Sequence, residues 1–238
     1  MKKLAVKSPV LFEILLIIAA FALALVFGIP CQTAGIGNEL SMAIGRILAG
    51  IVLLIVFRNC LKGKKQFSGF IVMLPALIFA LWNVFDHFMT NGEFHPFTAE
   101  ILLLGLAPAV FEEVVFRGIF INNLKESSKS DMEALLIPAL FFGIIHLTNI
   151  AGGGSIVQIL VQTGYAVVVG LVFGAIFITT GDLFSCILAH AAIDITNHMF
   201  GASSTTPVPV VIAFVVMLVL EAAYAVILVS RGKTAGAD

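Results

Sequence analysis

The sequence predicts an all-α membrane protein, a polytopic bundle of about eight transmembrane helices in one domain over residues 1–238. Of the 238 residues, 60% are hydrophobic and only 11% are charged, whereas soluble globular proteins carry roughly 25% charged residues. The mean hydropathy of +1.11 agrees with this composition. Apolar runs close to the roughly 20 residues that cross a bilayer also recur along the whole chain.

These apolar runs define eight predicted spans, and no long soluble segment separates them. The first span follows a basic start, as a secretory signal does. Its apolar stretch is longer than the roughly 7 to 15 residues of a signal, and no small-residue cleavage site follows it cleanly, so we expect a retained anchor. In chain order, the predicted spans are residues 10–27, 39–58, 68–88, 97–121, 133–149, 156–179, 184–200 and 207–229.

The basic residues predict the orientation of the spans. The loops at 28–38, 89–96, 149–155 and 201–206 contain no lysine or arginine. Positive residues beside a span are retained in the cytoplasm, so an even number of spans with both termini cytoplasmic is predicted. The basic residues at the predicted cytoplasmic ends are Lys2, Lys3, Lys7, Arg58, Lys62, Lys64, Lys65, Lys125, Lys129, Arg231 and Lys233.

Composition also argues against several kinds of function. The three cysteines, Cys31, Cys60 and Cys186, are odd in number and widely spaced, which indicates neither a disulfide framework nor a thiolate metal site. The net charge of −1 and the lack of an extended basic surface argue against a nucleic-acid partner. The function must therefore be sought in the polar residues within the spans.

The fourth span contains two adjacent carboxylates, Glu112 and Glu113, in an otherwise almost unbroken apolar run. A charged side chain at the bilayer centre costs roughly 2.5 to 3.5 kcal/mol on insertion scales, so such residues indicate a functional site by default. On a helix, Glu113 and Arg117 are neighbours at positions i and i+4, while Glu112 points about 100° away. We expect Arg117 to neutralise Glu113 and to leave Glu112 free.

Two later spans add polar side chains at helical spacing. Phe142 and His146 are four residues apart in the fifth span, as are His190 and Asp194 in the seventh. A rise of about 1.5 Å per residue places Glu112, His146, Asp194 and His190 roughly 9 to 21 Å from the predicted cytoplasmic ends, with His190 the shallowest, so we expect the four to share one layer of the bundle. Carboxylates and imidazoles from different helices at one depth are what a catalytic or ion-binding centre requires.

Together these motifs resemble the CPBP (Abi) family of intramembrane proteases, which includes the type II CAAX prenyl endopeptidases. The similar segment covers roughly residues 105–198, within a catalytic core expected at about 97–200. The resemblance implies a multi-pass peptide hydrolase, expected in a prokaryotic cell membrane, that acts on a membrane-associated peptide or protein. The motifs, in order, are Glu112-Glu113-x-x-x-Arg117, Phe142-x-x-x-His146 and His190-x-x-x-Asp194.

The resemblance also implies a role for each motif residue. Glu112 is expected to be the general base that, with His146, holds the attacking water. His190 and Asp194 are expected to face the developing oxyanion or a metal ion. Glu113 and Arg117 are expected to form a supporting pair. Peptide hydrolysis needs these two functions, an activated water and a stabilised oxyanion.

The cofactor stays open between none and a divalent metal. An ionised Asp194 only accepts hydrogen bonds, so it would have to be protonated, orient His190 or ligate a metal. Glu112, His146, His190 and Asp194 offer nitrogen and oxygen ligands suited to zinc, but no HExxH motif is present. We favour a metal-free glutamate mechanism.

Two other functions are compatible with the same residues. One is a proton- or cation-coupled transporter, and the other is a non-catalytic immunity or scaffold protein of the same fold. Transporters often contain inverted repeats, and no convincing repeat is found here, which favours the protease. A prenylated CAAX terminus is expected on the substrate only if the protein belongs to the prenyl-processing branch.

Further features of the spans have a packing or an unassigned role. Gly170 and Gly174 are expected to let the sixth span pack closely on a neighbour. The remaining charged residues are expected either to pair within the bundle or to line a cavity: Glu39, Arg46, Asp86, Glu100 and Glu221.

Overall fold

The computed structural model describes residues 8–58, 69–153, 155–201 and 207–232. These residues form helices and turns, with one isolated β-bridge between Phe94 and Phe200. The predicted all-α class is therefore confirmed. Some residues used in the predictions lie outside the described ranges: Lys2, Lys3, Lys7, Cys60, Lys62, Lys64, Lys65 and Lys233.

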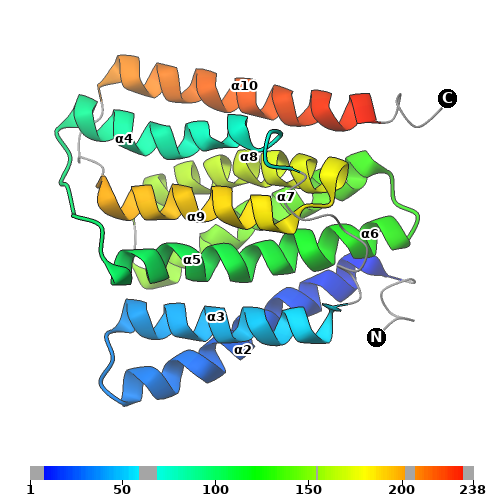
Figure 1. The fold of residues 1–238 in the computed structure, drawn as a ribbon, viewed down its shortest axis with the longest axis horizontal. Helices are drawn as coiled ribbons and strands as arrows, with labels where there is room; N and C mark the ends of the chain where they lie inside the picture. The colour runs from blue at the N-terminus through cyan, green and yellow to red at the C-terminus, as the bar shows by residue number, and fades with distance from the viewer. Residues whose placement is uncertain (1–7, 59–68, 154, 202–206, 233–238) are drawn as a thin grey trace.

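Each of the eight predicted spans contains a helix in its described part, and successive long segments run in opposite directions (Figure 1). As a result, α2 begins and α10 ends at the same end of the bundle. The elements are α2 (Pro9–Thr33), α3 (Asn38–Val56), η2 (Leu74–Leu77), α4 (Ile78–Thr90), α5 (Ala99–Glu113), η3 (Val114–Ile121), α6 (Asn122–Glu126), α7 (Asp131–Ile145), η4 (His146–Gly152), α8 (Ile156–Thr180), α9 (Leu183–Met199) and α10 (Val208–Gly232).

Five helical segments of the described chain are long and apolar enough to cross a membrane. They are Pro9–Thr33, Asn38–Val56, Asp131–Ile150, Ile156–Thr180 and Val208–Arg231. This finding supports an integral membrane protein. The count of eight crossings and the side on which the termini lie stay predictions.

Polar residues fix the starts of the three helices that carry the motifs. The Thr98 side chain accepts a hydrogen bond from the first turn of α5. Ser130 and Glu133 form a reciprocal capping box at the start of α7, and Asp182 accepts the backbone N–H of Ser185 at 3.1 Å at the start of α9. Each cap satisfies a backbone donor that the helix itself leaves unpaired, so the registers of α5, α7 and α9 are set near their first residues.

The structure corrects the expected limits of two spans. The third span was expected from residue 68, but α4 begins at Ile78, after a 3₁₀ turn that contains Pro75. Proline lacks an N–H and disfavours a helical residue before it, which explains the later start. In the fifth span, α7 ends at Ile145 and His146 begins a 3₁₀ segment.

The fourth span is longer than expected and is not α-helical throughout. It continues through α6 to Glu126, and its central part, η3, is a π-helix. A π-helix is wound so that each N–H bonds to the carbonyl five residues earlier, and such segments occur frequently at functional sites. Here the wide turn begins directly after Glu113, so it sets the direction in which Arg117 leaves the backbone.

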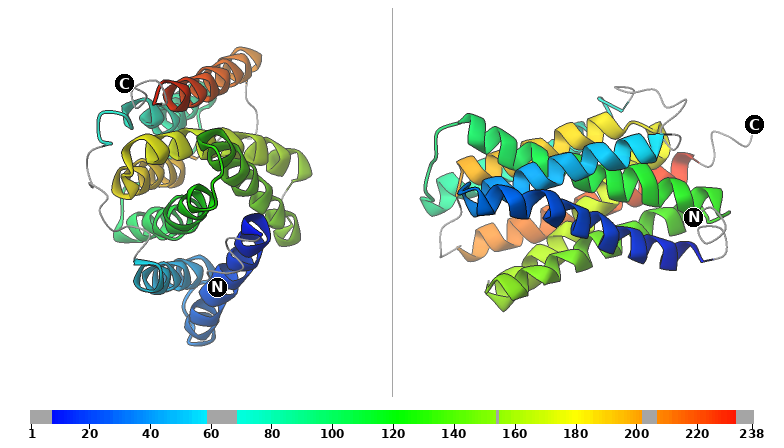
Figure 2. Two further views of the ribbon diagram at one scale, coloured as in Figure 1. Left: turned by 90° about the vertical axis from the view of Figure 1, so that its right-hand side faces the viewer. Right: turned by 90° about the horizontal axis from the view of Figure 1, so that it is seen from below.

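The helices are arranged around α5 and η3. In Figures 1 and 2, α2 and α3 lie on one side of the bundle, α4 and α10 lie on the other, and α5, α7, α8 and α9 lie between them. α3 packs on α5, α5 packs on α9, and α7 packs on α8. The helices that carry the three motifs therefore occupy the interior of the bundle.

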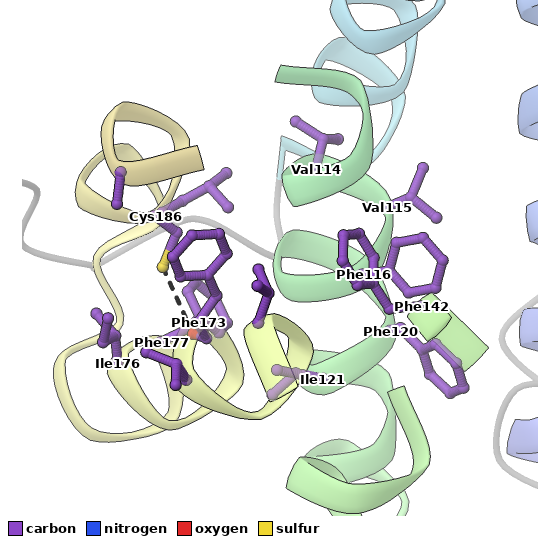
Figure 3. Packing of buried hydrophobic residues seen from close by; sticks show 14 of the residues in the cluster. Val114, Val115, Phe116, Phe120, Ile121, Phe142, Phe173, Ile176, Phe177 and Cys186 are labelled. Atoms are coloured by element: carbon purple, nitrogen blue, oxygen red, sulfur yellow. Dashed lines mark hydrogen bonds between the residues drawn. The ribbon is translucent and has the colours of Figure 1, made fainter. Parts of the chain in front are cut away.

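All eight residues of η3 are buried. Figure 3 shows Val114, Val115, Phe116, Phe120 and Ile121 projecting from this helix. Phe116 packs edge-to-face on Phe142 of α7, with ring centroids 5.2 Å apart. On the α8 side, Cys186 of α9 donates a hydrogen bond from its Sγ to the Phe173 carbonyl at 3.5 Å. η3 itself contacts α3, α7, α8 and α9.

Two glycines of α8 permit its close approach to α7. A Cβ at Gly170 would lie 2.9 Å from the Cα of Ala139, and a Cβ at Gly174 would lie 3.1 Å from a methyl group of Leu135. The expectation that this pair lets the sixth span pack closely is confirmed. The contact brings the Gly170 carbonyl within reach of η3.

Candidate active site

Glu113, Arg117 and His190 form a buried network between η3 and α9. Nη1 of Arg117 donates to Oε1 of Glu113 at 2.9 Å. Nδ1 of His190 lies 2.8 Å from the same oxygen. The side chains of Glu113 and Arg117 are only 0% and 1% exposed, so their charges depend on each other rather than on water.

Arg117 has further contacts that hold its guanidinium in place. Its Cζ lies 4.6 Å from the ring centroid of Phe142 and 5.4 Å from that of Phe173. Its Nη2 donates to the Gly170 carbonyl at 3.5 Å. Aromatic faces attract a guanidinium through the ring quadrupole. Arg117 is thus fully engaged by the protein itself.

The other nitrogen of His190 faces two further carboxylates. Nε2 lies 3.5 Å from Oδ2 of Asp194, one turn later on α9. It also lies 3.9 Å from Oε2 of Glu112 on α5. Acidic groups from two helices therefore surround the imidazole, and they supply the negative charge that a buried imidazolium needs.

His146 is held at the point where α7 passes into η4. Its Nδ1 lies 2.7 Å from the Phe142 carbonyl oxygen. A carbonyl can only accept, so Nδ1 carries the proton. In the neutral ring, Nε2 is then an acceptor. His146 can accordingly accept a proton from a water molecule or a substrate at Nε2.

The ring of Phe142 contacts both motif histidines and Arg117. Its ring centroid lies 5.3 Å from that of His146 and 5.9 Å from that of His190, and it also underlies the Arg117 guanidinium. Phe142 is 2% exposed. One buried ring therefore fixes the positions of both histidines and of the arginine.

Two cavities meet at these side chains. The first has a volume of about 390 Å³ and is lined by Glu112 and by residues of α2, α3, α5, α7, α8 and α9. The second has a volume of about 860 Å³ and is lined in part by aromatic residues of α4, α7, α8 and α10. His146, His190 and Asp194 line both cavities. Cavities of several hundred Å³ with a few convergent polar groups are typical ligand sites.

The structure brings all six predicted site residues into one region. Glu112, His146, His190 and Asp194 line the first cavity, while Glu113 and Arg117 lie behind it and support His190. Their catalytic roles stay a prediction.

Sequence reasoning missed the bond between Glu113 and His190. These residues are 77 positions apart in the chain, and helical spacing carries no information about such a contact. It also left Arg46 unassigned, and the structure places Arg46 on the wall of the first cavity. Its position inside a span was the one signal available.

The alternative of a divalent metal at Glu112, His146, His190 and Asp194 gains no support from the arrangement of donors. Among the residues that the structure describes, no group of three or more His, Cys, Asp or Glu side chains could hold a metal ion. A metalloprotease interpretation therefore has no support in this geometry.

Comparison with known proteins identifies the motif-bearing segment. Residues 94–196 match the family model described as type II CAAX prenyl endopeptidase Rce1-like. All three motifs lie within the matched residues, and the resemblance found in the sequence is confirmed. No curated protein and no solved structure matches the chain.

Proposed function

Because residues 94–196 match the type II CAAX prenyl endopeptidase family, we propose that this protein is an intramembrane endopeptidase with Glu112 as its general base. One observation carries the proposal: Glu112 lines a cavity beside two imidazoles, while the neighbouring Glu113 is engaged by Arg117 and His190. A carboxylate at a cavity wall can remove a proton from a water molecule.

The attacking water is proposed to lie between Glu112 and His146. Both side chains line the first cavity, and Nε2 of His146 is an acceptor in the neutral ring because Nδ1 donates to the Phe142 carbonyl. Glu112 takes the proton as the water attacks the peptide carbonyl. Glu112 then returns the proton to the leaving amine, as a general base and acid does in acyl transfer.

The oxyanion is proposed to be stabilised by protonated His190. Glu113 accepts the proton on Nδ1, and the proton on Nε2 is available to the developing negative charge. Asp194, 3.5 Å from Nε2, orients this side of the ring until the substrate oxygen replaces it. Arg117 and the imidazolium balance two of the three carboxylates, and Glu112 keeps the charge that a base needs.

The substrate is proposed to be a membrane-associated peptide, with an apolar modification held in the second cavity. Trp82, Tyr165 and Phe214 line this cavity, and their rings contact each other with centroids 5.2 to 5.8 Å apart. Apolar and aromatic walls are suited to a lipid chain. A prenylated CAAX terminus is the substrate that the family match supports best.

We further propose that the single domain crosses the membrane eight times with both termini in the cytoplasm, in a prokaryotic cell. α2 begins and α10 ends at the same end of the bundle, which supports an even number of crossings. The basic loops at that end support its cytoplasmic location.

The test compares the peptides released from membranes by wild type and by Glu112→Ala. We expect the variant to release none of the wild-type products while its unfolding midpoint in detergent stays the same. Glu100→Gln is the matched control, since Glu100 is an exposed carboxylate at the start of the same helix. Full cleavage by Glu112→Ala would refute the role of Glu112. Proton uptake by vesicles containing a protein that cleaves nothing would favour the transporter instead.

A further inference from the structure

Arg46 is a cation inside a candidate membrane span, and the described residues supply no ion-pair partner for it. It lies in α3 within the candidate span Asn38–Val56 and is half-buried. None of the ion pairs in the described part of the chain includes it. Keeping an unpaired arginine inside a membrane is costly, and such residues usually serve a function.

Arg46 lies in the deep part of the first cavity, on the level of the candidate base. Three helices line this cavity with residues that are eight positions apart, which corresponds to about 12 Å along a helix. α3 and α5 begin at the end of the bundle where α9 ends (Figure 1). Asn38, Leu104 and His198 are therefore at the outer part of the cavity, and Arg46, Glu112 and His190 are at its inner part.

The other charged groups of this cavity favour Arg46 as the site for an anionic ligand. Glu39, Glu112 and Asp194 line the cavity with carboxylates. Among the described residues that line it, Arg46 is the one side chain with a permanent positive charge. An incoming carboxylate would be repelled by the acidic groups and attracted at Arg46, where the guanidinium can bind both of its oxygens.

The second intramembrane arginine cannot serve this purpose. Arg117 is 1% exposed and donates to Glu113 at 2.9 Å, and it does not line either cavity. The two arginines thus have different environments. Arg117 is paired with Glu113 in the protein interior, whereas Arg46 lines the first cavity.

We propose that Arg46 binds the C-terminal carboxylate of the peptide substrate and so selects chains that are cut close to their end. This inference rests on the proposed endopeptidase function, because a CAAX sequence is by definition a C-terminal one. The carboxylate anchors the last residue of the substrate beside Arg46, and the bond to be cut then lies next to Glu112. The arginine is therefore a specificity-determining residue rather than a part of the hydrolytic machinery.

The experiment uses two prenylated peptides of identical sequence, one with a free C-terminal carboxylate and one with a C-terminal amide. Wild type is expected to prefer the free acid in kcat/KM by about tenfold to a hundredfold, the range of a hydrogen bond to a charged group. Arg46→Gln is expected to lower cleavage of the acid to the level of the amide, mainly through KM, and to leave cleavage of the amide unchanged. Arg46→Lys is expected to retain part of the preference.

Arg58→Gln is the matched control. Arg58 is exposed beyond the end of α3 and lines neither cavity, so its loss should leave the preference for the acid intact. Equal losses for both peptides in Arg46→Gln would mean that Arg46 only balances the acidic groups of the cavity. A loss that appears only in vesicles with anionic lipids would assign Arg46 to a lipid headgroup. Either result would overturn the proposal.

Failure of the underlying function can be recognised separately. If wild type cleaves neither peptide, the proposed endopeptidase activity is wrong. The binding of the acid and the amide to Glu112→Gln, with and without Arg46→Gln, then decides the carboxylate site by itself. Tighter binding of the acid that is lost with Arg46 supports the site, and equal binding of both peptides refutes it.

Discussion

Oε1 of Glu113 lies 2.8 Å from Nδ1 of His190, and this contact joins the first motif to the third. The same oxygen accepts a hydrogen bond from Arg117, whereas Oε2 of Glu113 has no partner among the described residues. Glu113 is thus more than the counter-ion of an arginine. It orients the imidazole that faces Glu112 and stabilises its protonated form, as a carboxylate behind a catalytic histidine does.

Glu113→Gln is expected to weaken the fold and the activity together. The substitution removes the charge that Arg117 needs in a site with almost no exposure, and breaking a buried ion pair in this way costs about 3 kcal/mol or more. Denaturant unfolding in detergent measures the loss. Lys125→Gln is the control, because its pair with Asp131 is partly exposed. An unchanged unfolding midpoint for Glu113→Gln would contradict the importance of this pair.

Phe142→Leu is expected to lower kcat. Leucine keeps the backbone carbonyl that holds Nδ1 of His146, but it removes the ring that contacts both histidines. A displacement of about 1 Å in a catalytic group can cost on the order of a hundredfold in rate. Steady-state kinetics on the same peptide test this expectation.

Phe141→Leu is the matched control for that substitution. Phe141 is the preceding residue on α7 and packs on Phe120 rather than on a histidine, with ring centroids 5.7 Å apart. A similar loss of kcat in both variants would indicate that α7 tolerates no smaller side chain at either position. The specific role of Phe142 would then be refuted.

Gly170→Ala is expected to destabilise the bundle by about 1 to 3 kcal/mol, the usual cost of overpacking. Its Cβ would lie 2.9 Å from the Cα of Ala139, a backbone atom that cannot rotate away. Gly164→Ala on the same helix meets no atom within 4 Å, and alanine is the better helix former, so this control should be as stable as wild type. Equal midpoints for the two variants would refute the tight contact between α7 and α8.

Prolonged treatment with a chelator is expected to leave cleavage intact. No group of donors suited to a metal ion is found among the described residues, and the proposed steps use only the carboxylate and imidazole groups of the chain. Activity and metal content are measured on the same sample. Loss of activity with loss of a bound ion, restored by adding that ion, would require a metal in the mechanism.

The sequence by itself determined the all-α class and named six candidate residues, which the structure places in one region. Hydropathy identified the helical segments because a bilayer requires long apolar runs. Charged residues are costly in a membrane, which made Glu112 and Glu113 candidates for a functional site. Helical spacing predicted the pair of Glu113 and Arg117, and the structure contains this pair. Spacing within one helix is encoded locally, so it can be read from the chain.

Only the tertiary structure decided how the motifs meet. The contact of Glu113 with His190 and the position of Phe142 between two histidines depend on the packing of α5, α7 and α9. The π-helical winding of η3 sets where Arg117 points, and the cavity shared by α3, α5 and α9 gives Arg46 its surroundings. These features join residues that are far apart in the chain, and their geometry arises from the summed packing of several helices rather than from any local pattern.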